Sequence, residues 1–142
     1  MFSPEAHENR VVEVEARLNP TGSTWAAVGF STHDVWGWWV DGQIWLWISP
    51  NGQYNVMVDG TSHSLVGGAQ AIPGQPTNGE HHAKLRYDPI QRTVSAWVNG
   101  HQVADSAPIP AATILDIQYA GISSLHGEHG QTTFDNFRLY LP

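Results

Sequence analysis

The sequence contains no cysteine, so no disulfide framework stabilises its fold. This absence fits either a cytosolic protein or a bacterial secreted protein that is built without bridges. Lysine and arginine together supply only 6 residues, and the net charge is −7 with histidine neutral. A chain so poor in basic residues lacks a patch that neutralises phosphates, which disfavours binding to nucleic acid or to an anionic membrane surface.

Charged residues of both signs make up only 13% of the chain, and no apolar run approaches the roughly 18–20 residues that a membrane span needs. The low charge argues against a helical bundle, whose exposed faces carry many Glu and Lys residues. The length suits one domain. Because Met1–Pro4 opens abruptly, we expect residues 1–9 to be a leader or an artificial start cut from a longer chain, and residues 10–142 to form the domain.

Glycine (14 residues) and proline (9 residues) are frequent, and they separate short segments in which apolar and polar residues alternate. Alternation with a period of two predicts strands, and short strands between turn residues are typical of an all-β sandwich. Asn-Gly pairs at 51–52 and 99–100 predict tight hairpins. Residues 67–79 and 106–113 are expected to be loops. We expect a two-sheet antiparallel sandwich of the jelly-roll type, with strands at 10–18, 24–32, 43–49, 53–59, 62–66, 80–87, 92–98, 101–104, 115–123 and 132–141.

The most unusual content of the chain is its seven tryptophans. In the strand predicted at 43–49, alternation puts Ile44, Leu46 and Ile48 on the core face and turns two tryptophans to the opposite face. Flat aromatic rings held outward on a rigid sheet are a platform for stacking sugar rings, and they are costly to leave bare. We therefore expect sugar rings to stack on the outward and rim-loop tryptophans, which are Trp25, Trp36, Trp38, Trp39, Trp45, Trp47 and Trp97.

Polar side chains on the same outward faces are candidates for reading the hydroxyl groups of the sugar. They are Gln43, Asn55, His82 and Arg86. The alternative for any one tryptophan is burial in a second layer, beneath the 67–79 loop or an oligomer partner, because tryptophan is highly buried on average.

Two segments resemble the concanavalin A-like superfamily, which includes lectin, laminin G-like and glucanase domains. Leu85–Pro89 with Thr93–Gly100 is similar to a hairpin that recurs in these domains, and Thr133–Leu139 resembles their terminal strand. The likeness runs from about Arg10 to the end of the chain and implies a jelly-roll fold. Within the superfamily the chain looks most like a non-catalytic carbohydrate-binding module, whose partner is a polysaccharide or oligosaccharide.

The resemblance also implies a structural calcium ion, which relatives hold with an aspartate of the terminal strand and backbone carbonyls. Asp135 occupies that position in this sequence, and carboxylate and carbonyl oxygens suit Ca²⁺. The alternative is that Asp135 fixes a turn or bulge. No dinucleotide fingerprint or phosphate loop is present, so no organic cofactor is expected.

Glu13 and Glu15 raise the alternative of a glycoside hydrolase, since residues two apart on a strand share a face, as paired acid and base groups require. The laminarinase- and lichenase-type glucanases of the superfamily carry a Glu-X-Asp-X-Glu strand. In Glu13–Arg17 the middle carboxylate is a glutamate and the last position is Arg17, which cannot serve as a general acid. We therefore expect no enzyme, with a diverged glycoside hydrolase as the first alternative.

A second alternative is an adhesive or structural domain whose aromatic residues contact protein. For the binding module itself, we expect a place within a larger multidomain protein. That protein is expected to be secreted or displayed on the cell surface, and to come from a bacterium.

Overall fold

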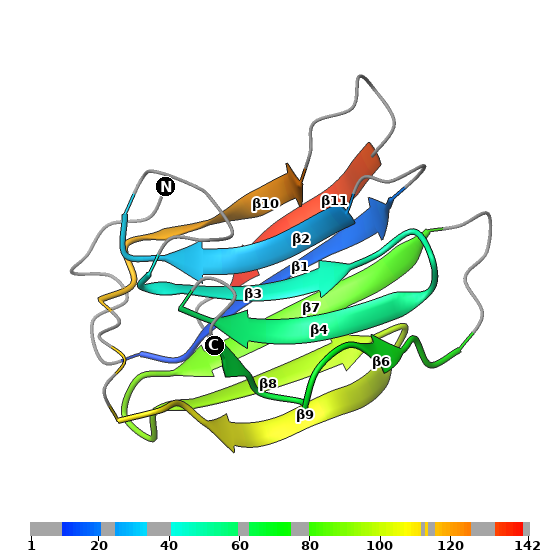
Figure 1. Ribbon diagram of the computed structural model, residues 1–142. Helices are drawn as coiled ribbons and strands as arrows, with labels where there is room; N and C mark the ends of the chain where they lie inside the picture. Colours follow the sequence, from blue (N-terminus) through cyan, green and yellow to red (C-terminus); the bar gives the residue numbers. More distant parts are fainter. Residues whose placement is uncertain are drawn as a thin grey trace.

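The structure of the chain is a computed structural model that describes residues 10–20, 25–33, 41–59, 63–74, 80–111, 113, 116–125 and 133–140, with only the backbone described at 124–125 and 133–137. The strands of these residues form two sheets packed face to face, with β2, β3 and β4 in front of β1 and β7 in Figure 1. Every pairing between them is antiparallel. The predicted all-β two-sheet sandwich is confirmed.

Within the described residues one sheet has five strands and the other has six. The five-stranded sheet runs in the order β11 (Thr133–Tyr140), β1 (Val12–Asn19), β7 (His81–Asp88), β8 (Thr93–Val98) and β9 (His101–Pro108). The six-stranded sheet runs in the order β10 (Tyr119–Leu125), β2 (Trp25–Ser31), β3 (Gln43–Ile48), β4 (Gln53–Val58) and β5 (His63–Ser64), and β6 (Gln70–Ala71) also pairs with β4.

The core lies between the sheets and consists of the residues that alternation turns inward. Phe30, Leu46 and Leu85 are among its fully buried members. Complete burial of one such side chain stabilises a fold by roughly 1.5–3 kcal/mol, so this layer supplies most of the driving force. The core face predicted for β3, with Ile44, Leu46 and Ile48, is therefore confirmed, and alternating apolar residues of β1, β2, β4, β7 and β8 enter the same core.

The Asn99-Gly100 hairpin is held by hydrogen bonds to two other segments of the chain. Asn99 has a φ of 52° and Gly100 a φ of 80°, which is the backbone that the Asn-Gly pair predicts. The side chain of Asn99 accepts a hydrogen bond from the His82 amide at 2.9 Å and donates one to the Pro73 carbonyl at 3.1 Å. The turn between β8 and β9 is thereby tied to β7 and to the segment that follows β6.

Several strand bounds differ from the prediction, and β5 (His63–Ser64) and β10 (Tyr119–Leu125) depart from the expected 62–66 and 115–123. Two stretches are strand where a loop or a strand end was expected. β6 lies inside the segment expected to be a loop, and β9 continues to Pro108 rather than ending at Ala104. Around this extension the register between β8 and β9 shifts, and Ser106 takes a positive φ of 48°. A bulged strand of this kind does not keep the strict alternation by which a sequence reveals a strand. No helix long and apolar enough to cross a membrane occurs in the part of the chain that the structure describes.

Candidate functional site

The outer face of the six-stranded sheet carries a second hydrophobic cluster, separate from the core between the sheets. We call it the aromatic cluster, and its members are Trp25, Ala27, Trp45, Trp47 and Met57. The side chains come from β2, β3 and β4, all on the side that alternation turns away from the core. The predicted direction of Trp25, Trp45 and Trp47 is therefore confirmed.

Trp45, in contrast, is completely buried, so the expectation that its ring is bare for a sugar is wrong. The ring lies against β2, where Gly29 is its direct partner across the strands. A Cβ added to Gly29 would lie 2.5 Å from Cε3 of Trp45. The small outward residues of β2 make room for the indole, which lies down on the neighbouring strand rather than standing out into solvent.

Gln43 is also completely buried, and the expectation that it reads sugar hydroxyls from an exposed position is wrong. Its Oε1 accepts a hydrogen bond of 2.8 Å from Nε1 of Trp45, and its Nε2 donates to Oγ of Ser31 at 3.1 Å. The Ser31 hydroxyl in turn donates to the His33 carbonyl at 2.6 Å. Gln43 therefore fixes the orientation of Trp45.

The rings of Trp25 and Trp47 are stacked, with centroids 4.5 Å apart and planes inclined by 9°. Trp47 keeps 8% of its surface exposed and its cross-strand partner Asn55 keeps 7%, whereas Trp25 is only half-buried. Oδ1 of Asn55 accepts a hydrogen bond from Ser64 at 2.6 Å. Among the described tryptophans of the cluster, Trp25 is thus the one that presents most surface to solvent.

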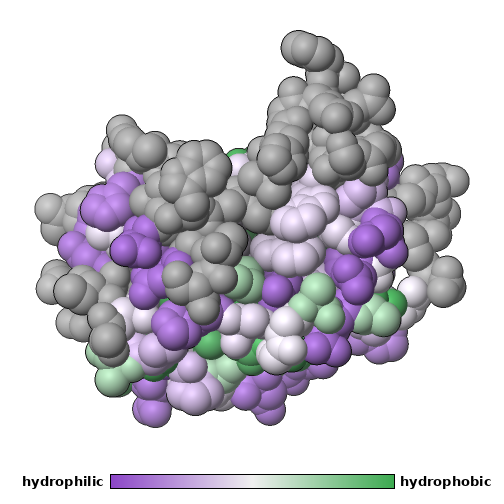
Figure 2. All heavy atoms as spheres, in the orientation of Figure 1, coloured by the Kyte–Doolittle hydropathy of each residue, from purple (hydrophilic) through white to green (hydrophobic). Residues whose placement is uncertain are grey.

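The surface around this face is not a continuous apolar patch. Figure 2 shows the molecule in the orientation of Figure 1, and the hydrophobic residues visible among the coloured atoms are scattered between hydrophilic ones. The described part of this view therefore shows no continuous patch of aliphatic side chains, while indoles, which have an intermediate hydropathy, are coloured pale.

Several predicted site residues lie outside what the structure describes. Trp36, Trp38 and Trp39 fall in the segment 34–40, so their place in a rim loop stays a prediction. The side chain of Asp135 is not described either. Its backbone pairs with Arg17 beside a shift in register between β1 and β11. Among the described residues no three histidine or acidic side chains come together as a metal site, and calcium stays a prediction.

The remaining predicted residues, His82, Arg86 and Trp97, lie on the outer face of the five-stranded sheet, across the sandwich from the aromatic cluster. The structure therefore divides the predicted residues between two faces. Nζ of Lys84 lies 5.0 Å from the ring centroid of Trp97, which is half-buried. A cation–π contact of this kind engages one side of that indole.

Glu13 and Glu15 both contact basic side chains on the same outer face. Oε1 of Glu13 lies 3.2 Å from Nε of Arg86, and its Oε2 lies 3.4 Å from Nζ of Lys84. Oε2 of Glu15 lies 2.9 Å from Nε2 of His82. The contacts of both carboxylates join β1 to β7.

The hydroxyl of Tyr140 donates a hydrogen bond of 2.6 Å to Oε1 of Glu15. This bond, with smaller contributions from the charges of His82 and Lys84, lowers the pKa of Glu15. A glycosidase acid needs the opposite, a carboxyl whose pKa is raised so that it still carries its proton. The surroundings of Glu15 therefore oppose the role of general acid.

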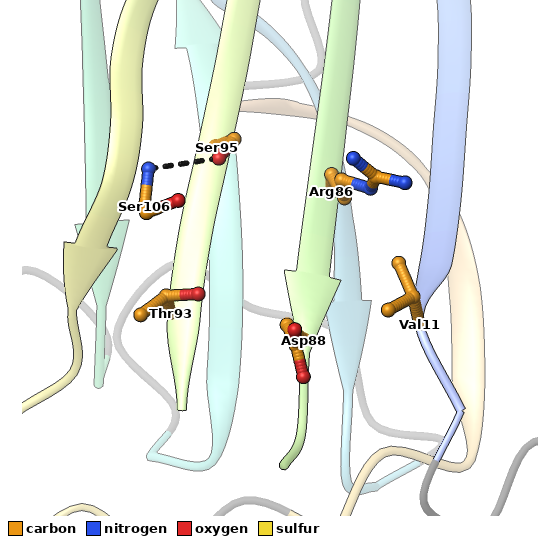
Figure 3. Close-up of a pocket in the computed structure, with 6 residues that line it drawn as sticks. All are labelled: Val11, Arg86, Asp88, Thr93, Ser95 and Ser106. Carbon is orange, nitrogen blue, oxygen red and sulfur yellow. Dashed lines mark hydrogen bonds between the residues drawn. The ribbon is translucent and has the colours of Figure 1, made fainter. Parts of the chain in front are cut away.

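One end of this face contains a polar hollow of about 170 Å³. It is lined by Val11, Arg86, Asp88, Thr93, Ser95 and Ser106 (Figure 3). Of these residues the sequence-based reasoning singled out Arg86 alone. Alternation along the strands could have identified Thr93 and Ser95, because it places both on the same outward face as Arg86. It could not have identified Ser106, which lies beyond a bulge that alternation does not predict.

Comparison with known proteins identifies the fold but no sequence family. No protein-family model and no curated protein matches the sequence. Among solved structures, the Trypanosoma rangeli sialidase superposes with a TM-score of 0.58 and 18% identity over 93% of this chain. The chain spans only about a fifth of that enzyme, since 20% of its length is covered.

Two further structures match as well. The carbohydrate binding module CBM66 from Bacillus subtilis superposes with a TM-score of 0.56 and 11% identity, over 92% of this chain and 74% of the module. Domains LG4-5 of the mouse laminin alpha1 chain superpose with a TM-score of 0.57 and 13% identity, over 95% of this chain and 36% of the laminin chain. The protein therefore has the concanavalin A-like jelly-roll fold, as the resemblance predicted.

Proposed function

We propose that this domain binds a polysaccharide or oligosaccharide without cleaving it, and that Trp25 and Trp47 form the part of the site on which a sugar ring stacks. The observation that carries the proposal is the stacked indole pair on the outer face of the six-stranded sheet. The fold supports it, because a carbohydrate binding module of similar fold matches over most of its own length. Because a fold alone does not define a ligand, the proposal of sugar binding rests mainly on the indole pair.

The layers beneath Trp25 explain why the site is rigid. Trp47 stacks on Trp25 and belongs to the same buried cluster as Trp45 and Met57. Trp45 is in turn fixed by Gln43 and by contact with Gly29. A sugar that stacks on Trp25 therefore meets a ring whose position is set before binding, which reduces the entropy lost on association.

Other groups complete this proposal. Asn55, which pairs with Trp47 across the strands and keeps 7% of its surface exposed, is proposed to bind a ring hydroxyl. Trp36, Trp38 and Trp39 are proposed to form the wall of the site from the loop between β2 and β3. A structural calcium ion at Asp135 is proposed as a stabilising element away from the sugar.

The non-catalytic part of the proposal is supported by the ion pairs of Glu13 and Glu15, since neither carboxylate stands unengaged in a cleft. We propose further that the domain belongs to a larger secreted or cell-surface protein and holds it on a polysaccharide. The match to about a fifth of a much longer chain is consistent with this arrangement.

Affinity electrophoresis tests the proposal. The protein is run through gels that contain plant, fungal or bacterial polysaccharides, each against a gel without polysaccharide. We expect retardation in at least one gel, strong loss of that retardation in Trp25→Ala, and unchanged retardation in Gln102→Ala, whose exposed side chain lies on the opposite sheet. Equal retardation of all three proteins would remove Trp25 from the site.

Two outcomes separate the alternatives. Release of reducing sugar that is abolished by Glu13→Gln or Glu15→Gln would establish a hydrolase. No retardation in any gel, together with self-association in sedimentation velocity, would favour an adhesive domain whose aromatic residues contact protein.

A further inference from the structure

The polar hollow lies on the side of the sandwich opposite the aromatic cluster, and the function proposed above does not use it. Three adjacent strands supply most of its lining. Arg86 and Asp88 come from β7, Thr93 and Ser95 from β8, and Ser106 from β9. Figure 3 shows Thr93, Ser95 and Ser106 on one side of it, Arg86 and Val11 on the other, and Asp88 at its end.

The hydroxyl side of the hollow is fixed by the bulge between β8 and β9. The backbone amide of Ser106 donates a hydrogen bond of 2.9 Å to Oγ of Ser95, in the region where the register between the two strands shifts. Oγ of Ser95 has thereby used one acceptor site and keeps its own proton for donation. The bulge brings Ser106 to the same side of the sheet as Thr93 and Ser95, so that three hydroxyls converge.

The opposite side offers charged groups that are held in place. Nε of Arg86 is buried and lies 3.2 Å from Glu13, yet it makes no hydrogen bond of good geometry with the described residues. Oδ1 of Asp88 accepts hydrogen bonds from the amides of Ile90 at 2.9 Å and Gln91 at 3.0 Å. The hollow thus combines fixed donors and fixed acceptors within a small space.

Charge decides which ligand suits this set. An anion would meet Arg86 but would be repelled by Asp88, by the nearby Glu13 and by a chain of net charge −7. A metal cation would be repelled by Arg86 and would find a single hard carboxylate, where Ca²⁺ takes six to eight oxygen ligands. An uncharged molecule with several hydroxyl groups uses both the donors and the acceptors, and nothing in the lining opposes it.

We propose that the polar hollow is a second saccharide site, which takes one uncharged sugar residue. Its volume of about 170 Å³ is below that of pockets for drug-sized ligands, roughly 300–1,000 Å³, and suits a single ring. The proposal shares the ligand class of the proposed function but rests on different residues. A domain with sugar sites on both outer faces binds two segments of polysaccharide at once, which raises avidity without any new contact.

Amide chemical shifts of the whole chain, followed by NMR, test the second site. The probes are D-glucose, D-galactose and D-mannose as uncharged sugars, and sodium acetate and inorganic phosphate as anions. We expect at least one sugar to shift the amides of Asp88, Thr93, Ser95 and Ser106, and neither anion to do so. Absence of such shifts with all three sugars, or shifts with the anions alone, overturns the proposal.

Thr93→Val removes one hydroxyl at nearly constant shape, and we expect it to weaken sugar binding at the hollow about threefold to tenfold, the value of one hydrogen bond. Asp88→Asn separates the ligand classes, because the loss of its negative charge should strengthen the binding of an anion and weaken that of a sugar. Gln102→Ala lies on the same face outside the hollow and should change nothing.

The two proposed sites can be refuted independently of each other. Trp25→Ala should strongly weaken retention by polysaccharide gels and leave the amide shifts at the hollow intact. If sugars shift the amides at the hollow and retention by the gels is the same in Trp25→Ala as in the wild type, the second site is supported and the site at Trp25 is refuted. Retention that depends on Trp25, without any shift at the hollow, would do the reverse.

Discussion

The indole of Trp45 lies directly on the backbone of Gly29 in the adjacent strand, so that the largest side chain of β3 faces the smallest residue of β2. This pairing lays the ring flat against the sheet and buries it completely. Trp45 belongs to the same cluster as Trp47, whose ring is stacked with that of Trp25. The contact between Gly29 and Trp45 therefore fixes one member of the cluster that carries the proposed sugar-stacking pair.

Gly29→Ala should destabilise the domain, because the new methyl group would overlap the ring of Trp45 and the carbonyl of Ile44. Overpacking of this kind costs about 1–3 kcal/mol in the free energy of unfolding, measured by urea denaturation. In the background of Trp45→Leu the same alanine should cost less, because the overlap with the ring is removed while the overlap with the Ile44 carbonyl remains. Equal costs in the two backgrounds would show that the ring does not press on Gly29.

Gln43→Leu should also lower the free energy of unfolding, by about 1–3 kcal/mol, because it leaves the buried Nε1 of Trp45 without its acceptor. Gln53→Leu is the matched control, since Gln53 is exposed at the start of β4 and its substitution should stay within about 0.5 kcal/mol. Similar urea midpoints for both variants would contradict the positioning role of Gln43.

Burial lowers the pKa of His81, whose Nδ1 lies 3.1 Å from Nδ2 of Asn99. The unfolded chain then binds more protons than the folded chain. Stability from the neutral ring is complete above about pH 6.5 and is lost as the pH falls below that value. We expect the free energy of unfolding to fall less steeply between about pH 7 and pH 5 in His81→Gln than in the wild type. Identical slopes would refute this assignment.

Tyr140→Phe removes the hydrogen bond that does most to lower the pKa of Glu15. A carboxyl with a lowered pKa adds stability above its unfolded value, about 4.3, and loses it as the pH falls through the folded value. The variant should be less stable at pH 7 by about 0.5–1 kcal/mol, a figure discounted for solvent at this exposed pair. Urea titrations in acid should show the gap closing, and a gap that stays constant with pH would contradict this account.

The sequence was sufficient to predict the two-sheet sandwich and the side chains of its core. Strict alternation in β1, β3 and β7 predicted which side chains enter the core, and the Asn99-Gly100 pair predicted a tight hairpin with positive φ. Period-two patterning works there because a one-residue slip would move every apolar side chain to the wrong face. The bulged end of β9 breaks that period, which is why its extension to Pro108 was missed.

The site was less predictable, because alternation says which way a side chain points and not whether that face is covered. Trp45 points outward as predicted and is nevertheless buried. The missing information was the register between β2 and β3, which sets Gly29 opposite Trp45. The division of the predicted residues between two faces likewise depended on strand order, because Trp97 and Trp47 have the same parity in different sheets.

Titration calorimetry of Trp25→Ala against Trp97→Ala, with a polysaccharide that retards the wild-type protein, tests the central claim most directly. The two variants each lose one half-buried indole from opposite faces of the sandwich. Loss of a stacked sugar contact predicts an affinity lower by about tenfold or more for Trp25→Ala, or about 1.4 kcal/mol, and near wild-type affinity for Trp97→Ala. Wild-type affinity in a folded Trp25→Ala protein would contradict the claim that a sugar stacks on the Trp25–Trp47 pair.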